Sequence, residues 1–275
     1  MNKIAAFFCR LFGRKKPKEI KIGLALGSGG AKGFAELGVL RAFEENDVKF
    51  DMVAGTSIGG IIGAFYSDGY TSTDIGSLIS NMNFSEIISG LMFSMDTDGL
   101  FKVLNRELGG LTFEELRKPF AAVATAFDTG AEKVFSSGNV AKALCASACY
   151  LPYFKPVVID GIKYVDGAYV NSVPADVVKN MGADYVIGVD LSVREKKSGF
   201  MSKVLPSYDK RVAEPWKKGY DNADVVIHPD LKDFKSTSSA SSEKMFDLGY
   251  RAAMQVIPKI KEDIQNLKCP KKKKK

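Results

Sequence analysis

Short apolar runs recur along the chain and alternate with longer segments in which apolar residues lie three or four positions apart. The run 21–26, with Ile22, Leu24 and Leu26 among small residues, is typical of a buried strand, and segment 35–45 after it is typical of a helix. Alternation of this kind is typical of a mainly parallel central sheet covered by helices, so we predict a three-layer α/β fold. Strands are predicted at 21–26, 50–54, 120–127, 132–136, 157–165, 185–190 and 224–228, and a closing helix at 243–266.

Two places depart from the strand–helix alternation because turn residues separate strand-like runs. Asp128-Thr129-Gly130 and Asp160-Gly161 each predict an antiparallel hairpin. Region 72–118 contains helical patterns and no strong strand. Its apolar faces are Phe84, Ile87, Ile88, Leu91 and Met92, followed by Phe101, Leu104 and Leu108.

The most informative local motif is Gly55-Thr56-Ser57-Ile58-Gly59, which follows the apolar run 52–54. Apolar residues at i, i+3, i+4 and i+7 from Ile58 predict a helix directly after it. A strand, a tight turn and a helix are what a nucleophile elbow requires, with the Ser57 hydroxyl at the helix N-terminus. The same motif also occurs as an ordinary turn of small residues, so by itself it leaves catalysis open.

A glycine-rich loop, Gly27-Ser28-Gly29-Gly30-Ala31-Lys32-Gly33, lies between the first predicted strand and helix. Backbone N–H groups in such a loop can bind a phosphate or stabilise the oxyanion of an acyl intermediate. A Walker A loop is excluded because Gly-Lys-Ser/Thr is absent. A dinucleotide site expects an acidic residue at the end of the next strand, where Gly55-Thr56-Ser57 stands. The loop therefore favours an oxyanion hole.

A serine nucleophile needs a base, and the chain offers two candidates. Asp166, in Asp166-Gly167-Ala168, follows a strand-like run; a carboxylate is a weak base with a reference pKa of about 3.9, so burial would have to raise it. The other candidate is His228, the single histidine, at a predicted strand end. A Ser57–His228–acid triad and a direct Ser57–Asp166 pair both remain hypotheses at this point.

Taken in order, the segments 28–33, 55–59 and 166–168 resemble the patatin-like phospholipase family, over roughly residues 20 to 265. The resemblance implies that Ser57 is the nucleophile, that Asp166 is the base, and that the backbone at Gly29 and Gly30 forms the oxyanion hole. It also implies phospholipid or lysophospholipid substrates and no metal or organic cofactor. The residues that support the motifs are Ser28, Lys32, Gly33, Gly55, Gly59 and Gly167. The further landmarks are 123–125, the Pro152 region, 171–174, 182–184 and 249–253.

The chain departs from the family pattern in three places. Ser28 stands where the loop usually begins with glycine, Lys32 stands where arginine is frequent, and the stretch 146–152 is one residue longer than usual. Apolar faces such as those within residues 84–109 usually pack in the core. In a lipid hydrolase they could instead line the acyl pocket or form a lid, and these alternatives stay open. A catalytically idle lipid- or phosphate-binding module on the same fold is the alternative function.

The two ends of the chain carry its positive charge. Residues 1–18 hold six basic and no acidic residues, and residues 268–275 hold six lysines; the rest of the chain has 27 basic against 32 acidic residues, about −5. A basic tail (1–18) and a polylysine tail (268–275) therefore flank a predicted acyl hydrolase domain at 19–267. A nucleic-acid binder would carry basic residues within its fold, so that class is not favoured.

The N-terminal tail has the pattern of a helix lying in a membrane interface. It is too short and too charged to span a bilayer. The alternative is a helix that packs on the protein's own surface. Cysteine spacing gives no disulfide or zinc pattern and no export signal is evident, so we expect a cytoplasmic protein in peripheral contact with the inner face of an anionic membrane. The apolar face of the tail is Ile4, Phe7, Phe8, Leu11 and Phe12, and the cysteines are Cys9, Cys145, Cys149 and Cys269.

Overall fold

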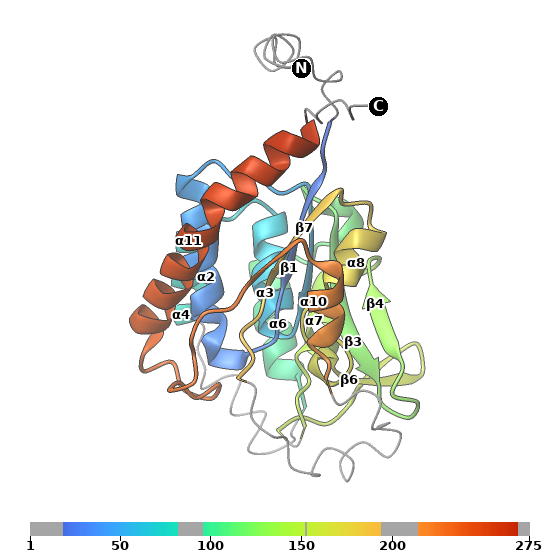
Figure 1. Ribbon diagram of the computed structural model, residues 1–275. Helices are drawn as coiled ribbons and strands as arrows, with labels where there is room; N and C mark the ends of the chain where they lie inside the picture. Colours follow the sequence, from blue (N-terminus) through green and yellow to red (C-terminus); the bar gives the residue numbers. More distant parts are fainter. Residues whose placement is uncertain (1–18, 82–95, 152, 194–213, 269–275) are drawn as a thin grey trace.

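The computed structural model describes residues 19–81, 96–151, 153–193 and 214–268. An eight-stranded sheet forms the centre, with helices on both faces (Figure 1). The strands are β1 (Ile22–Leu26), β2 (Met52–Thr56), β3 (Phe120–Ala126), β4 (Glu132–Phe135), β5 (Val157–Ile159), β6 (Ile162–Asp166), β7 (Tyr185–Val189) and β8 (Val225–Ile227). The α-helices are α2 (Gly33–Glu45), α3 (Ile58–Ser67), α4 (Ser72–Asn81), α6 (Asp98–Glu107), α7 (Val140–Ser147), α8 (Ala175–Asn180), α10 (Lys217–Asn222) and α11 (Ser242–Lys268). Single 3-10 turns are η1 (Gly30–Lys32), η2 (Phe113–Glu115) and η3 (Gly167–Tyr169).

The sheet confirms the predicted mainly parallel α/β architecture. Its order is β5-β6-β3-β2-β1-β7-β8, with β4 also paired to β3. Five strands that are adjacent in the sheet run parallel to one another: β3, β2, β1, β7 and β8. The antiparallel pairs are β3–β4, β3–β6 and β5–β6. Both predicted hairpins are therefore present, as β3–β4 and β5–β6.

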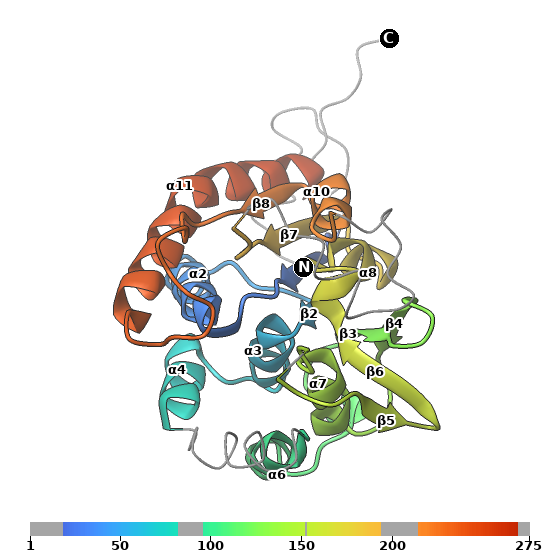
Figure 2. The same ribbon diagram turned by 90° about the horizontal axis from the view of Figure 1, so that it is seen from below.

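Side chains of the central strands alternate between two cores, as the pleat of a strand requires. Leu24 and Leu26 of β1 belong to the larger cluster with Phe43 of α2, whereas Ala25 between them belongs to the smaller cluster with Val178 of α8. Figure 2 shows α2, α3, α4 and α11 on one side of the sheet and α8 and α10 on the other. Cys145 and Cys149 are free and buried, in separate clusters, as expected of packing residues.

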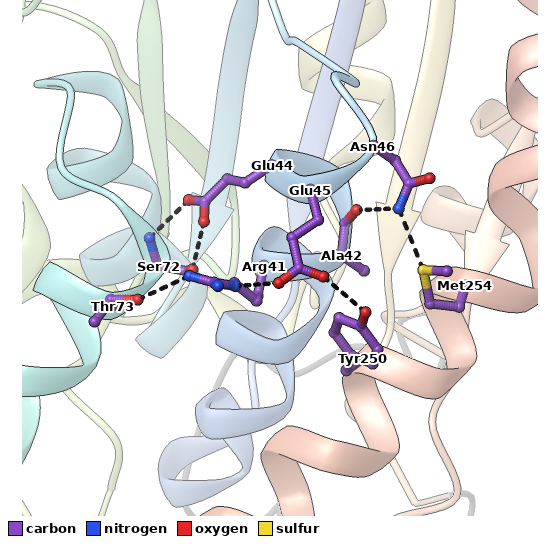
Figure 3. Close-up of polar contacts among 9 residues, drawn as sticks. All are labelled: Arg41, Ala42, Glu44, Glu45, Asn46, Ser72, Thr73, Tyr250 and Met254. Carbon is purple, nitrogen blue, oxygen red and sulfur yellow. Dashed lines mark hydrogen bonds and ion pairs between the residues drawn. The ribbon is translucent and has the colours of Figure 1, made fainter.

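Helix α2 follows the glycine-rich loop and is held in place by hydrogen bonds to α4 and to α11. Glu44 accepts hydrogen bonds from the backbone N–H and the hydroxyl of Ser72 at the start of α4, at 2.7 and 2.6 Å (Figure 3). Glu45 accepts one from Tyr250 of α11, at 2.7 Å. A Cβ on Gly249 would lie 1.9 Å from the carbonyl oxygen of Ala35, so α11 and α2 touch backbone to backbone there. These contacts hold the helix that carries the loop.

The described part of region 72–118 is helical, with α4 and α6 and no strand. Leu104 and Leu108 are buried in the larger core, and Phe101 packs against it. The predicted face at 84–92, and with it the lid hypothesis, lies outside the described residues, as do both tails and Pro152. None of the described helices combines the length and the apolar character needed to cross a membrane.

Candidate active site

Strands β2 and β6 meet end to end along one edge of β3. Thr56, the last residue of β2, is opposite Val123, and Asp166, the last residue of β6, is opposite Ala124. Strand β4 pairs with β3 over residues 122–125, so it occupies the other edge, because one edge cannot pair with two strands at the same residues. Residue 57 and Asp166 are therefore neighbours in space although 109 positions separate them in the chain.

Ser57 forms the turn between β2 and α3. Its φ of 56° and ψ of −122° are a conformation that non-glycine residues rarely adopt, as expected at a nucleophile elbow. The hydroxyl donates a hydrogen bond to Oδ2 of Asp166 at 2.7 Å. Both side chains are buried, with Ser57 8% and Asp166 1% exposed. The structure thus brings together the two residues predicted to act as nucleophile and base.

Ser147, at the end of α7, holds the strained turn in place. Its hydroxyl accepts a hydrogen bond from the backbone N–H of Ser57 at 2.9 Å and donates one to the carbonyl of Val123 at 2.6 Å. Ser147 is fully buried. Ser147 falls in the stretch 146–152, which departs from the family pattern, and the sequence predicted no role for it. Its sequence context could have revealed this role. Ser147 ends a helix whose residues are mostly apolar, and a buried serine there must find polar partners inside the core.

Asp166 makes three further hydrogen bonds, one through its carboxylate and two through its backbone. Its Oδ1 accepts one from the backbone N–H of Ala168 at 2.8 Å. Its backbone N–H donates to the carbonyl of Cys149 at 2.9 Å, and its carbonyl accepts from the Thr125 hydroxyl at 2.8 Å. Burial raises the pKa of Asp166 to about 7, although the hydrogen bonds from Ala168 and Ser57 oppose the rise. Burial thus supplies the basicity that a solvated aspartate lacks.

The glycine-rich loop packs directly against the serine turn. A Cβ on Gly59, in the first turn of α3, would lie 2.5 Å from the carbonyl carbon of Leu26 and 2.6 Å from the carbonyl oxygen of Gly27. Only glycine lets the helix start so close to the end of β1. The other motif glycines also lie against neighbouring atoms: a Cβ on Gly33 would be 2.4 Å from Ile58 Cγ1, one on Gly55 2.2 Å from the Gly59 carbonyl oxygen, and one on Gly167 2.3 Å from the Val123 carbonyl oxygen.

The N–H groups of Gly29 and Gly30 differ from the others in the loop in their hydrogen bonding. Among the described residues they donate to no acceptor, whereas the four N–H groups around them are all engaged. Gly30 has a φ of +57°, which turns the chain sharply at this point. The loop therefore leaves two adjacent donors open for a negatively charged group. The engaged donors are Gly27 to Glu36 Oε1 at 2.6 Å, Ser28 to the Ser172 carbonyl at 2.9 Å, Ala31 to the Ser236 carbonyl at 2.8 Å, and Lys32 to the Gly29 carbonyl at 3.2 Å.

Glu36, for which the sequence predicted no role, lies against this loop. It is fully buried in the first turn of α2, where its Oε1 accepts the Gly27 N–H. Its Oε2 has no hydrogen-bond partner among the described residues. Burial raises the pKa of Glu36 well above its usual value, against the smaller lowering effect of the Gly27 hydrogen bond. Lys32, one turn earlier, is also buried.

His228 lies away from the Ser57–Asp166 pair. Its Nδ1 is 3.0 Å from the carbonyl oxygen of Asp190 and 3.3 Å from the Oδ2 of the same residue. His228 follows β8, which is three strands from β2, or about 14 Å at the usual strand spacing. The structure pairs His228 with Asp190, so it does not form the Ser57–His228–acid triad. No group of three potential metal ligands occurs among the described residues.

Comparisons with known proteins agree with this architecture. Residues 24–179 match the family described as patatin-like phospholipase. Human patatin-like phospholipase domain-containing protein 6 is 31% identical over 229 residues, and a lysophospholipase of Mycosarcoma maydis is 32% identical over 185 residues. These matches cover 78% and 62% of this chain but only 16% and 10% of the relatives, so the chain corresponds to a small part of each.

Among solved structures, VipD from Legionella pneumophila is similar in fold. The TM-score is 0.64, with 14% identity over 88% of this chain and 68% of VipD. At that identity the likeness concerns the fold alone. The family match spans more than half of the chain and contains the buried serine–aspartate pair and the glycine-rich loop. The chain therefore belongs to the patatin-like phospholipase family.

Proposed function

We propose that the protein hydrolyses acyl esters of lipids with a Ser57–Asp166 dyad and a covalent acyl-enzyme. The observation that carries the proposal is the buried 2.7 Å hydrogen bond from the Ser57 hydroxyl to Asp166. A serine held in a strained turn and bonded to a carboxylate whose pKa is about 7 has the arrangement of an activated nucleophile. The two open N–H groups of the glycine-rich loop supply the second requirement, a place for the oxyanion.

In this mechanism the Ser57 oxygen attacks the ester carbonyl carbon while Asp166 takes the hydroxyl proton. The carbonyl oxygen becomes an oxyanion that accepts hydrogen bonds from the N–H groups of Gly29 and Gly30. Collapse of the intermediate breaks the ester bond, and Asp166 gives its proton to the departing alcohol. A water molecule then loses a proton to Asp166 and attacks the acyl-enzyme. Collapse of this second intermediate breaks the bond to Ser57, Asp166 gives the proton to the Ser57 oxygen, and the fatty acid is released.

Phospholipids and lysophospholipids are the proposed substrates. The support is the family to which the chain belongs and the lysophospholipase named among its relatives. We assign the activity to a domain at residues 19–267 and propose that it works in the cytoplasm, at the inner face of the membrane. The basic tails on either side of an acidic body support that location, because an anionic leaflet attracts them.

Labelling with a fluorophosphonate probe tests the proposal. The wild-type protein should be labelled and should release fatty acid from lysophosphatidylcholine. Ser57→Ala should abolish both, whereas Ser239→Ala, a change in an exposed loop, should alter neither. A folded wild-type protein that neither reacts with the probe nor releases fatty acid would contradict the proposal and favour the idle lipid- or phosphate-binding module.

A further inference from the structure

Exposed apolar side chains gather in one short segment of the chain. The described residues include seven large apolar side chains that are exposed, and four of them fall within residues 150–162. Single exposed apolar residues are ordinary, but a cluster of them marks a surface that contacts something other than water. We name these four residues the apolar edge: Tyr150, Tyr153, Val158 and Ile162, which are 42%, 47%, 55% and 50% exposed.

The apolar edge adjoins the candidate active site. Tyr150 follows Cys149, whose carbonyl accepts the Asp166 N–H. The Tyr150 ring stacks on Tyr169, three residues after Asp166, with ring centroids 5.4 Å apart. On its other side lies Tyr153, with centroids 6.3 Å apart. A partner that covers the two exposed tyrosines would therefore lie beside the catalytic aspartate.

The other two residues of the apolar edge lie on the β5–β6 hairpin, which stands at a corner of the molecule (Figure 2). The hairpin turns at Asp160 and Gly161, both with positive φ, the combination that allows a tight two-residue turn. Val158 is opposite Lys163 and Ile159 is opposite Ile162. Because successive residues of a strand alternate between faces, Val158 and Ile162 point to opposite faces of the hairpin.

We propose that the apolar edge docks the active site on the surface of a lipid bilayer. This inference rests on the proposed function for its lipid substrate. A folded protein partner covers one face of a hairpin, whereas the interfacial layer of a bilayer surrounds both faces, and here both faces carry an exposed aliphatic side chain. Tyrosine suits the same layer, because its ring is apolar and its hydroxyl remains hydrated.

The charges near the apolar edge fit an anionic bilayer. Lys155 and Lys163 are exposed within the same stretch of chain, against a single acidic residue, Asp160. Lysines near an anionic leaflet add an attraction that salt screens. We therefore expect the docking to have an apolar part, which does not respond to salt, and a smaller part that depends on anionic lipid.

The test compares matched substitutions in the full-length chain. The double variant Val158→Thr/Ile162→Thr removes apolar surface but keeps β-branched side chains, which suit strands. The matched control is Val134→Thr, an exposed valine on β4, at the opposite edge of β3 from β6. Both are made in a Ser57→Ala background, so that bound lipid is not consumed, and sedimented with phosphatidylcholine vesicles with or without phosphatidylglycerol.

The double variant should bind both kinds of vesicle about tenfold more weakly or worse, whereas Val134→Thr should bind as the parent does. With Ser57 restored, the double variant should hydrolyse a water-soluble ester at the parent rate, which shows that it is folded. If it does not fold, the single variants Val158→Thr and Ile162→Thr are measured instead. The pair Lys155→Gln/Lys163→Gln should bind the anionic vesicles more weakly than the parent does and should bind the pure phosphatidylcholine vesicles equally well.

Vesicle binding by the double variant that equals the parent's would overturn the inference. Self-association of the parent that the double variant loses, with vesicle binding unchanged, would assign the apolar edge to a second copy of the chain instead and would equally overturn it. The sedimentation assay does not depend on catalysis. Failure of the proposed function, seen as no probe labelling of the wild type, is therefore distinguishable from failure of this inference.

Discussion

Replacing Asp166 with asparagine should nearly abolish ester hydrolysis and, at the same time, stabilise the fold at pH 8 relative to pH 4. The amide has nearly the shape of the carboxyl group. Its oxygen can still accept the Ala168 N–H and its NH₂ can donate to the Ser57 oxygen. The Ser57 O–H then loses its acceptor, a cost that does not change with pH. It cannot take a proton, so the rate should fall by about 10²–10⁴, the range that general base catalysis supplies.

The gain in stability follows from the raised pKa. Burial raises the pKa of Asp166 to about 7 in the fold, against 3.8 for an unperturbed aspartate side chain. Between these pH values the unfolded chain ionises the group and the fold does not, so the free energy of unfolding of the wild type falls as pH rises. At about 1.4 kcal/mol per pKa unit, the penalty is below about 1 kcal/mol at pH 4 and grows to roughly 4 kcal/mol at pH 8. Asparagine carries no such penalty.

Two measurements check this reasoning. Urea denaturation of the wild type and of Asp166→Asn, followed by the fluorescence of the single tryptophan, Trp216, should show the variant gaining stability relative to the wild type from pH 4 to pH 8. Initial rates on a water-soluble ester should show wild-type activity rising with pH through a midpoint near 7, as Asp166 loses its proton. The residual activity of the variant should not rise with pH in this way.

Either of two results would refute the argument. A stability difference that is the same at pH 4 and pH 8 would mean that the fold does not raise the pKa of Asp166. Turnover by a folded Asp166→Asn protein at the wild-type rate would mean that another group takes the Ser57 proton.

Four further predictions concern other parts of the molecule. Ser147→Ala leaves the Ser57 N–H and the Val123 carbonyl unpaired, so it should lower kcat on a soluble ester with little change in KM and cost about 1–3 kcal/mol in urea denaturation; unchanged kcat would show that the turn holds without it. Glu36→Gln keeps an acceptor for the loop and should retain activity, whereas Glu36→Leu should lose about tenfold or more in kcat; equal rates for the two would contradict a positioning role. His228→Ala should keep most of the ester hydrolysis activity. A loss of about 10²-fold in that activity, in a folded protein, would support the Ser57–His228–acid triad instead. Deleting residues 1–18 should weaken sedimentation with anionic vesicles while sparing soluble-ester hydrolysis, and equal pelleting would show that the tail is not an anchor.

The sequence alone predicted the strands, the helices that follow the first two strands, the closing helix and the two loops of the site, because each depends on neighbouring residues. Burial of an apolar run or of one helix face leaves a periodic pattern, which placed β1 and α2 at nearly their observed bounds. The serine turn and the glycine-rich loop were equally visible, since a strand that turns sharply into a helix requires glycine at fixed positions. The alternation of strands and helices was enough for the α/β class.

Only the tertiary structure decided which groups meet. Ser57 and Asp166 are neighbours because β6 continues along the edge of β3 where β2 ends, and strand order leaves no periodic signal in the sequence. The same holds for Ser147, which reaches the serine turn from α7, and for His228, which strand order places beside Asp190. The pKa of Asp166 depends on how completely the packed chain excludes water around the carboxylate. Burial of that kind is set by elements from all over the chain, so no local pattern of residues encodes it.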